Sequence, residues 1–315
     1  MQPSSPRDVD VAEAMAVLRA GGIVAVPTET VYGLAADALN PAAVARVFRV
    51  KGRPEHHPLI VHLASADRLP GWAERIPDAA WRLADAFWPG PLTLVLARGP
   101  LASDQVTAGL STVAVRVPDH ALTLALLDGL GSGVAAPSAN RFGRVSPTTA
   151  EHVRRDLDGD IDAILDGGPC RVGIESTIVD LSPDDPRDWA VLRPGGIDAS
   201  AIGEVLGHPV PIAMGGPKKA PGQMASHYAP SSRLEVVPPA DVPARRAYWG
   251  AAGKAVVVLG RAELGERADA WARALYGAIR EADLRRPDVI VVETPPGGAL
   301  ADAVADRLRR ASARG

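Results

Sequence analysis

The stretch 23-IVAVPTETVYGL-34 is the most informative part of this sequence. Its first four residues form a continuous apolar run, which predicts a buried β-strand. The run ends at Pro27, and a Thr-Glu-Thr triplet follows at once. Two hydroxyls and a carboxylate at the end of a buried strand lie at a sheet edge, where they can hold a small polar ligand. We therefore expect residues 27–34 to form part of a binding site rather than core.

The composition indicates a folded protein without a strong charge bias. The 315 residues are enough for one large domain or two ordinary ones. Hydrophobic residues make up 47% of the chain, which is enough for a sizeable core. The formal net charge of −3 counts against a protein dedicated to coating nucleic acid or anionic membranes. Cys170 is the single cysteine, which excludes an intrachain disulfide and a cysteine-rich zinc site.

Neither a targeting segment nor a metal-binding motif is visible in the sequence. No apolar run approaches the roughly 18 residues of a membrane-spanning helix. Residues 1–10 are polar and lack the apolar centre of a signal peptide, so the expected location is the cytoplasm. No second ligand accompanies His62 at a recognised spacing, and no metal site is expected.

The apolar pattern predicts a first domain in which strands and helices are interleaved. Strands are expected at residues 23–26, 59–63, 92–96, 113–117, 134–136, 161–165, 176–181 and 190–192. Helices are expected at residues 11–20, 41–50, 78–88, 121–127 and 148–157. This mixture predicts an α/β (or α+β) domain with a mixed, twisted sheet.

The character of the sequence changes after residue 213. Residues 214–231 are rich in glycine, proline and lysine, which is typical of a linker. Beyond them, strand, helix, strand and helix are expected at residues 255–259, 268–284, 289–292 and 300–311. The predicted organisation is a catalytic domain at 1–213, a linker at 214–231 and a small Rossmann-like βαβα domain at 232–315.

Basic residues gather where the helix at 41–50 ends. Lys51 is the one lysine among the first 217 residues, and Arg53 follows it closely. Cations at a helix C-terminus stabilise its dipole, and this structural interpretation is reasonable. Lysine and arginine also bind polyphosphates, the first as a point charge and the second as a bidentate fork. Both interpretations remain open from the residues alone.

Other candidate site residues lie beside the predicted strands. His62 lies on a strand, where a single histidine is usually structural. Arg116 ends an apolar strand and needs an anionic partner, either an internal carboxylate or that of a ligand. Ser138 and Asn140 follow the strand at 134–136 and can cap a turn or contact a ligand. Ser146 precedes a predicted helix, whose first N–H groups attract anions.

Together these segments resemble the YrdC-like threonylcarbamoyl-adenylate synthases. The resemblance follows the family in order and spacing over about residues 11–210. The matching segments are 27–34, 51–53, 58–62, 88–93, 112–116, 136–140, 173–178 and 192–195. Residues 220–230 resemble the linker of the long, two-domain form of the family.

The resemblance implies both a reaction and a set of roles. L-Threonine, bicarbonate and ATP, with Mg²⁺, give threonylcarbamoyl-AMP and pyrophosphate in an open cleft. The catalytic cations, expected on the ATP phosphates, are Lys51 and Arg53, and Arg193 joins them. The threonine or carbamate is expected to contact Thr28, His62, Arg116 and Ser176. The rest of the nucleotide is expected to contact Thr112, Ser138, Asn140 and Ser146, and the site to be covered by Tyr228.

The product is expected to supply other proteins that transfer threonylcarbamoyl to tRNA, with weak or no direct tRNA binding here. Two alternatives remain. One is a carbamoyltransferase domain of the kind found in hydrogenase maturation proteins, which the single cysteine disfavours. The other is an RNA-binding module, which the net charge disfavours and a salt-dependent binding assay would test.

Overall fold

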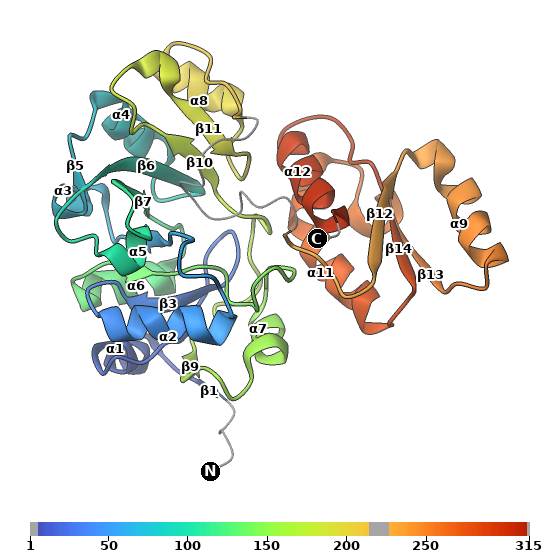
Figure 1. Cartoon of the computed structure of the whole chain (residues 1–315), viewed down its shortest axis with the longest axis horizontal. Coiled ribbons are helices and arrows are strands. Elements are labelled where there is room, and N and C mark those ends of the chain that lie inside the picture. The colour runs from blue at the N-terminus through green and yellow to red at the C-terminus, as the bar shows by residue number, and fades with distance from the viewer. Residues whose placement is uncertain (1–5, 214–226, 314–315) are drawn as a thin grey trace.

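The computed structural model describes residues 6–213 and 227–313, which form a larger and a smaller α/β body (Figure 1). Most of the predicted linker, residues 214–226, lies outside the described residues. The larger body is built on an 11-stranded mixed sheet and the smaller on a three-stranded parallel sheet. Among the described residues, no helix combines the length and apolar character needed to cross a bilayer.

The strands of the larger sheet follow the order β1-β9-β2-β3-β8-β4-β7-β6-β10-β11, and β5 pairs with β6. Their bounds are β1 Arg7–Asp8, β2 Val24–Val26, β3 Gly33–Asp37, β4 Ile60–His62, β5 Ala73–Glu74, β6 Leu92–Arg98, β7 Thr112–Arg116, β8 Val134–Ala135, β9 Ala163–Ile164, β10 Thr177–Asp180 and β11 Ala190–Arg193. Both parallel and antiparallel pairs occur, which confirms the mixed sheet.

The larger body has eight α-helices among its described residues. Their bounds are α1 Val11–Arg19, α2 Pro41–Lys51, α3 Leu69–Trp72, α4 Asp78–Phe87, α5 Asp104–Thr107, α6 Ala121–Leu130, α7 Ala150–Leu157 and α8 Ala199–Leu206. The start of α2 is fixed by Asn40, whose side chain accepts hydrogen bonds from the N–H groups of Ala42 and Ala43. Gly52 ends α2 in the left-handed region, at φ 61°.

β2 is buried on both faces, as its apolar sequence predicts. Ala25 packs in the cluster that contains residues of α2 and α7. Val24 and Val26 pack on the other side, in the cluster that contains residues of α1 and α6. Because successive side chains of a strand point to opposite faces, a strand between two helical layers is apolar throughout.

The alternation on β4 and β7 places two polar side chains together. Val61 and Val115 point into a large apolar cluster on one side of the sheet. Their neighbours His62 and Arg116 point to the opposite face, and the parallel register pairs them directly. The register therefore brings to one point two residues that are 54 positions apart in the sequence.

The smaller body, the C-terminal domain, contains one strand and two helices more than predicted. Its sheet has the order β12-β14-β13, with β12 Arg233–Val237, β13 Val256–Leu259 and β14 Val289–Glu293. Its helices are α9 Val242–Ala251, α10 Arg261–Leu264, α11 Ala268–Leu284 and α12 Ala301–Ser312. The predicted elements at 255–259, 268–284, 289–292 and 300–311 are confirmed, whereas β12, α9 and α10 were not expected. In Figure 1, α11 and α12 face the larger body and α9 lies on the far side.

The two bodies are in close contact through the segment that precedes β10. Gly173 has φ +82°, and a Cβ there would lie 2.5 Å from the carbonyl oxygen of Ala272 on α11. Arg273 of the same helix donates from Nε to the carbonyl of Arg171 at 3.0 Å. A side chain at position 173 would separate helix and segment, so glycine is required for this approach.

Candidate active site

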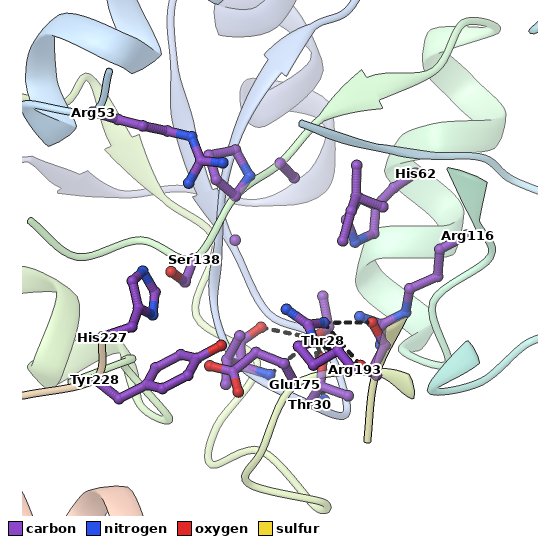
Figure 2. Close-up of a pocket in the computed structure, with 16 residues that line it drawn as sticks. Thr28, Thr30, Arg53, His62, Arg116, Ser138, Glu175, Arg193, His227 and Tyr228 are labelled. Carbon is purple, nitrogen blue, oxygen red and sulfur yellow. Dashed lines mark hydrogen bonds between the residues drawn. The ribbon is translucent and has the colours of Figure 1, made fainter. Parts of the chain in front are cut away.

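A buried cavity lies where the turn after β2, the ends of β4 and β7 and the loop after β8 meet. Its polar lining consists of hydroxyl, guanidinium, imidazole, carboxyl and phenol groups from Thr28, Thr30, Arg53, His62, Arg116, Ser138, Glu175, Ser176, Arg193, His227 and Tyr228. Figure 2 shows Arg53 and Ser138 apart from His62 and Arg116, with Thr28 and Arg193 between. The cavity is partly open, and its free volume of about 50 Å³ holds a few water molecules but is too small for ATP.

The turn after β2 forms one wall of this cavity through Thr28, Thr30, Val31 and Gly33. Tyr32 and Leu34 instead belong to an apolar core cluster, so the expectation of a binding site rather than core is wrong for this part of residues 27–34. Thr28 Oγ1 donates to the carbonyl of Val31 at 2.7 Å and lies 2.8 Å from Thr30 Oγ1. The backbone N–H of Ala139 donates to the carbonyl of Tyr32 at 2.8 Å. These bonds join the turn to the loop after β8, so the two polar segments form one surface. The Thr28 hydroxyl both holds the turn and faces the cavity.

Arg116 has the internal carboxylate partner that one interpretation of its sequence position predicts, and it also lines the cavity, where a ligand could reach it. Its Nη2 lies 2.7 Å from Glu29 Oε1, and both side chains are at most 5% exposed. Its Nε donates to the carbonyl of Gly90 at 3.2 Å. The other carboxylate oxygen of Glu29 accepts the N–H of Asp119 at 3.1 Å. Arg116 is therefore held by an internal ion pair while it also lines the cavity.

His62 is a neutral group in the cavity wall. Burial, reinforced by the positive charge of Arg116, lowers the pKa of His62 to about 3. Its Nδ1 has no hydrogen-bond partner within residues 6–213 and 227–313. A neutral imidazole with an unsatisfied nitrogen is suited to a hydrogen bond with a ligand.

The other two arginines of the wall are fixed by backbone carbonyls. Arg53 Nη2 donates to the carbonyl of Pro58 at 2.9 Å, and burial lowers the Arg53 pKa to about 10. Arg193 donates from Nε and Nη2 to the carbonyl of Ser176, at 3.1 and 2.8 Å. Ser176 Oγ lies 2.8 Å from Thr93 Oγ1, on the neighbouring strand β6. Each guanidinium thus has a defined orientation before any ligand binds.

Lys51 is buried but is not among the residues that line the cavity. Its ammonium group donates to the carbonyl of Ser138 and, at 2.5 Å, to that of Asn140. Burial first, and then the charge of Arg53, hold the Lys51 pKa well below its usual value. Lys51 therefore fixes the loop that presents Ser138, which is a third role beside helix-dipole partner and phosphate ligand.

Three other predicted residues lie behind or beside the wall rather than in it. Asn140 donates from Nδ2 to the carbonyls of Arg141 and Arg144, at 2.8 and 2.9 Å. Ser146 Oγ donates to Glu175 Oε1 at 2.6 Å. Thr112 begins β7, four residues before Arg116 on the same strand face. Their predicted contacts with a nucleotide remain predictions.

Tyr228 lines the cavity, and its predicted role as a cover for the site stays a prediction. Its ring is 5.8 Å from that of Tyr276, nearly parallel to it, and 5.2 Å from the Arg307 guanidinium carbon. Its hydroxyl is buried and lacks a hydrogen-bond partner in the described part of the chain. Burial, and next the nearby Glu175, raise the Tyr228 pKa.

The cavity wall also contains a buried carboxylate, that of Glu175, which was not predicted from the sequence. Burial favours the neutral form of Glu175, but Arg307 and then Arg193 outweigh it, and the pKa is lowered to about 2. Tyr276 and Arg307 belong to the C-terminal domain, more than 100 positions away in the sequence. The glutamate directly before Ser176, in a segment that resembles the family, could have indicated this part of the site. Nothing in the sequence indicated its distant partners Tyr276 and Arg307.

The comparisons with known proteins agree with this geometry. The family model described as "Telomere recombination" matches residues 16–195, and that of the threonylcarbamoyl-AMP synthase C-terminal domain matches residues 197–313. The threonylcarbamoyl-AMP synthase of Pyrococcus abyssi is 43% identical over 318 residues, which cover 95% of this chain and 93% of that protein. The crystal structure of P. abyssi Sua5 complexed with L-threonine has a TM-score of 0.90 at 41% identity, covering 96% of this chain and 94% of that one.

Two further relatives define the extent of the match. The Bacillus subtilis threonylcarbamoyl-AMP synthase is 41% identical over 330 residues, covering 98% of this chain and 94% of that protein. A putative threonylcarbamoyl-AMP synthase of Mycobacterium tuberculosis is 38% identical over 201 residues, which cover 91% of that protein but only 64% of this chain. The matches over nearly the full chain include both bodies, and the chain therefore belongs to the threonylcarbamoyl-AMP synthase family, in its two-domain form.

Proposed function

We propose that the cavity condenses L-threonine, bicarbonate and ATP into threonylcarbamoyl-AMP and pyrophosphate. The observation that carries this proposal is the convergence of three buried guanidinium groups on one cavity, from Arg53, Arg116 and Arg193. Burying three cations is unfavourable unless anions complete the site. The L-threonine complex of the P. abyssi protein supports an amino acid as one of these ligands.

The chemistry explains why cations dominate the site. The amino nitrogen of threonine forms a C–N bond with bicarbonate carbon, water is lost, and an anionic carbamate results. A carbamate oxygen then attacks the α-phosphorus of ATP, and pyrophosphate leaves with the electrons of the broken P–O bond. Because both reactants are anions, screening and alignment matter more than a strong base.

The positions of the arginines suggest a division of the cavity. Arg116, beside the neutral His62, is assigned to the threonine carboxylate. Arg53 lies at the other side of the cavity in Figure 2 and is assigned to the ATP phosphates, together with Arg193. Thr28 and Ser176 are assigned to the threonine or carbamate. This division keeps the amino acid and the nucleotide apart until carbamate and α-phosphorus meet.

Residues behind the wall are assigned indirect roles. Lys51 is proposed as a positioning residue, because its ammonium group holds the carbonyls of Ser138 and Asn140. Ser146 acts through Glu175, to which it donates a hydrogen bond. Thr112 remains a proposed nucleotide contact. The loop with Ser138 is then the part of the wall that meets the nucleotide directly.

A free volume of about 50 Å³ is too small for ATP, so part of the wall is proposed to move when the substrates bind. Tyr228 is assigned to that part of the wall. When this part of the wall closes again, it excludes water, which would otherwise hydrolyse the mixed anhydride.

Mg²⁺ is proposed to enter with ATP, bound to its phosphates. The described residues contain no group of three or more His, Cys, Asp or Glu side chains that could hold a metal. Glu175 in the cavity wall already accepts hydrogen bonds from Ser146, Tyr276 and Arg307. The protein residues thus fit a metal carried by the nucleotide, where it would neutralise phosphate charge.

The product is proposed to supply proteins that transfer threonylcarbamoyl to tRNA, without tight tRNA binding by this chain. The cytoplasm is retained as the compartment, since ATP, bicarbonate and tRNA are available there. Pyrophosphate release tests the proposal, with threonine, bicarbonate and ATP each omitted in turn. Pyrophosphate release should require all three substrates. Release that does not depend on threonine would overturn the assignment.

A further inference from the structure

Glu175 is an unexpected group for a cavity that binds anions. It lines the cavity and is only 7% exposed. Its pKa of about 2 keeps it ionised at neutral pH. A buried carboxylate beside phosphate and carbamate groups repels both, so its charge must be neutralised from another side.

Both oxygens of this carboxylate are occupied by donors outside the cavity lining. Ser146 Oγ donates to Oε1 at 2.6 Å. Tyr276 OH and Arg307 Nε donate to Oε2, at 2.9 and 2.6 Å. Two of these three donors belong to the C-terminal domain, and the Arg307 side chain is completely buried. The C-terminal domain thus reaches the wall of the cavity through one carboxylate.

The position of Arg307 is itself fixed by a second set of contacts. Its Nη1 donates to the carbonyl of Pro194 and to Asp306 Oδ2, both at 3.0 Å. Pro194 directly follows Arg193 at the end of β11. Arg307 is therefore attached to both segments whose side chains meet in the cavity, the one with Glu175 and the one with Arg193.

Arg193 lines the same cavity as Glu175. It is therefore the cation with which Glu175 would pair in the absence of Arg307. After Arg307, it is the charge that most favours the ionised form of Glu175. It now donates to the carbonyl and hydroxyl of Ser176 instead. A buried carboxylate that loses its partner seeks the nearest remaining donor, because an unpaired buried charge is very unfavourable.

We propose that Arg307 and Tyr276 are positioning residues: by occupying Glu175, they keep this carboxylate from drawing Arg193 away from the nucleotide. The proposal rests on the proposed function in one respect, the assignment of Arg193 to ATP. It gives the C-terminal domain a defined task at the site.

Affinity for a non-hydrolysable ATP analogue, measured by calorimetric titration of the full chain, tests this proposal. Arg307→Met should weaken binding by roughly tenfold or more, the scale of one lost charge-assisted hydrogen bond. Adding Glu175→Gln should restore affinity to within about threefold of the wild type, because the competing charge is then gone. Thermal melting shows whether each variant is folded.

Arg273→Met is the matched control, since the Arg273 side chain also joins α11 to the segment before Glu175 but donates to the carbonyl of Arg171 and not to Glu175. It should leave affinity unchanged. If Arg307→Met does not fold, Tyr276→Phe replaces it, with an expected loss of about threefold that Glu175→Gln again reverses. A folded variant with wild-type affinity, or a loss that Glu175→Gln does not relieve, would overturn the proposal. Wild-type protein that binds the analogue but releases no pyrophosphate would overturn the proposed function alone.

Discussion

Arg116 and Glu29 form a buried ion pair, with 2.7 Å between Nη2 and Oε1, in the wall of the cavity. The pair explains two features of the sequence. Arg116 needed an anionic partner, and Glu29 in the turn after β2 had no assigned role. Glu29 holds the guanidinium in place before the ligand arrives. The turn is thus both a ligand-facing surface and the support of a neighbouring strand.

Arg116→Met should abolish threonine-dependent turnover, because the group assigned to the threonine carboxylate is lost. It should also lower the free energy of unfolding by about 3–5 kcal/mol, since Glu29 keeps a buried charge without a partner. Chemical denaturation and pyrophosphate release measure the two effects. Arg98→Met is the control: its pair with Asp104 is largely exposed, and its loss should cost less than about 1 kcal/mol. Equal destabilisation by the two substitutions would contradict the role of the pair.

Lys51→Met should remove most of the activity and lower the free energy of unfolding by about 3 kcal/mol, because two carbonyls of the loop at 138–140 lose a charged donor. Hydrogen exchange of the backbone amides in this loop should become faster. Arg49, exposed in the same last turn of α2, provides the control. If Lys51 served only the helix dipole, both substitutions would cost less than about 1 kcal/mol and leave turnover intact.

Stability should decrease as the pH falls from 7 to 5, because the His62 imidazole binds a proton in the unfolded chain but stays neutral in the folded protein. His62 has a folded pKa of about 3, below the roughly 6.5 of an unfolded histidine, so the unfolded state binds the extra proton in this range. Its contribution to the loss is about 2 kcal/mol between pH 7 and pH 5. Denaturant titrations of His62→Asn should show a correspondingly smaller loss. An unchanged pH dependence in His62→Asn would refute the account.

Thr93→Val should raise the threonine KM by roughly fivefold, since Ser176 loses the hydroxyl partner that lies 2.8 Å from its own. The two side chains have nearly the same shape, so packing is preserved. Thr107→Val removes a hydroxyl that bonds to the carbonyl of Ser103, away from the cavity, and should leave KM unchanged. A similar KM for both variants would show that Thr93 does not orient Ser176.

The sequence predicted those parts of the fold that depend on local patterns. The apolar runs at 23–26 and 59–63 and the helical pattern at 41–50 each specify an element through nearest neighbours, and each was predicted correctly within a few residues. β3 was not expected, because its Gly-Leu-Ala-Ala-Asp sequence has little β-propensity. It forms because it pairs with β2 and β8 in the middle of the sheet.

The candidate site was predicted to the extent that single segments present it. Thr28, His62 and Arg116 line the cavity because strand ends bring them there. Whether Lys51 touches a ligand or a backbone carbonyl depends on the path of a loop almost 90 positions away, which no local pattern specifies. The contact of Arg307 with Glu175 depends on how two domains meet, and it leaves no periodic signal in the sequence.

We propose that carbamate attacks the α-phosphorus of ATP in this cavity. Mass spectrometry of the products formed from ¹³C-bicarbonate, threonine and ATP tests this most directly. We predict threonylcarbamoyl-AMP that carries one ¹³C, together with one equivalent of pyrophosphate. Formation of ADP and phosphate, or an AMP product without the label, would contradict the account.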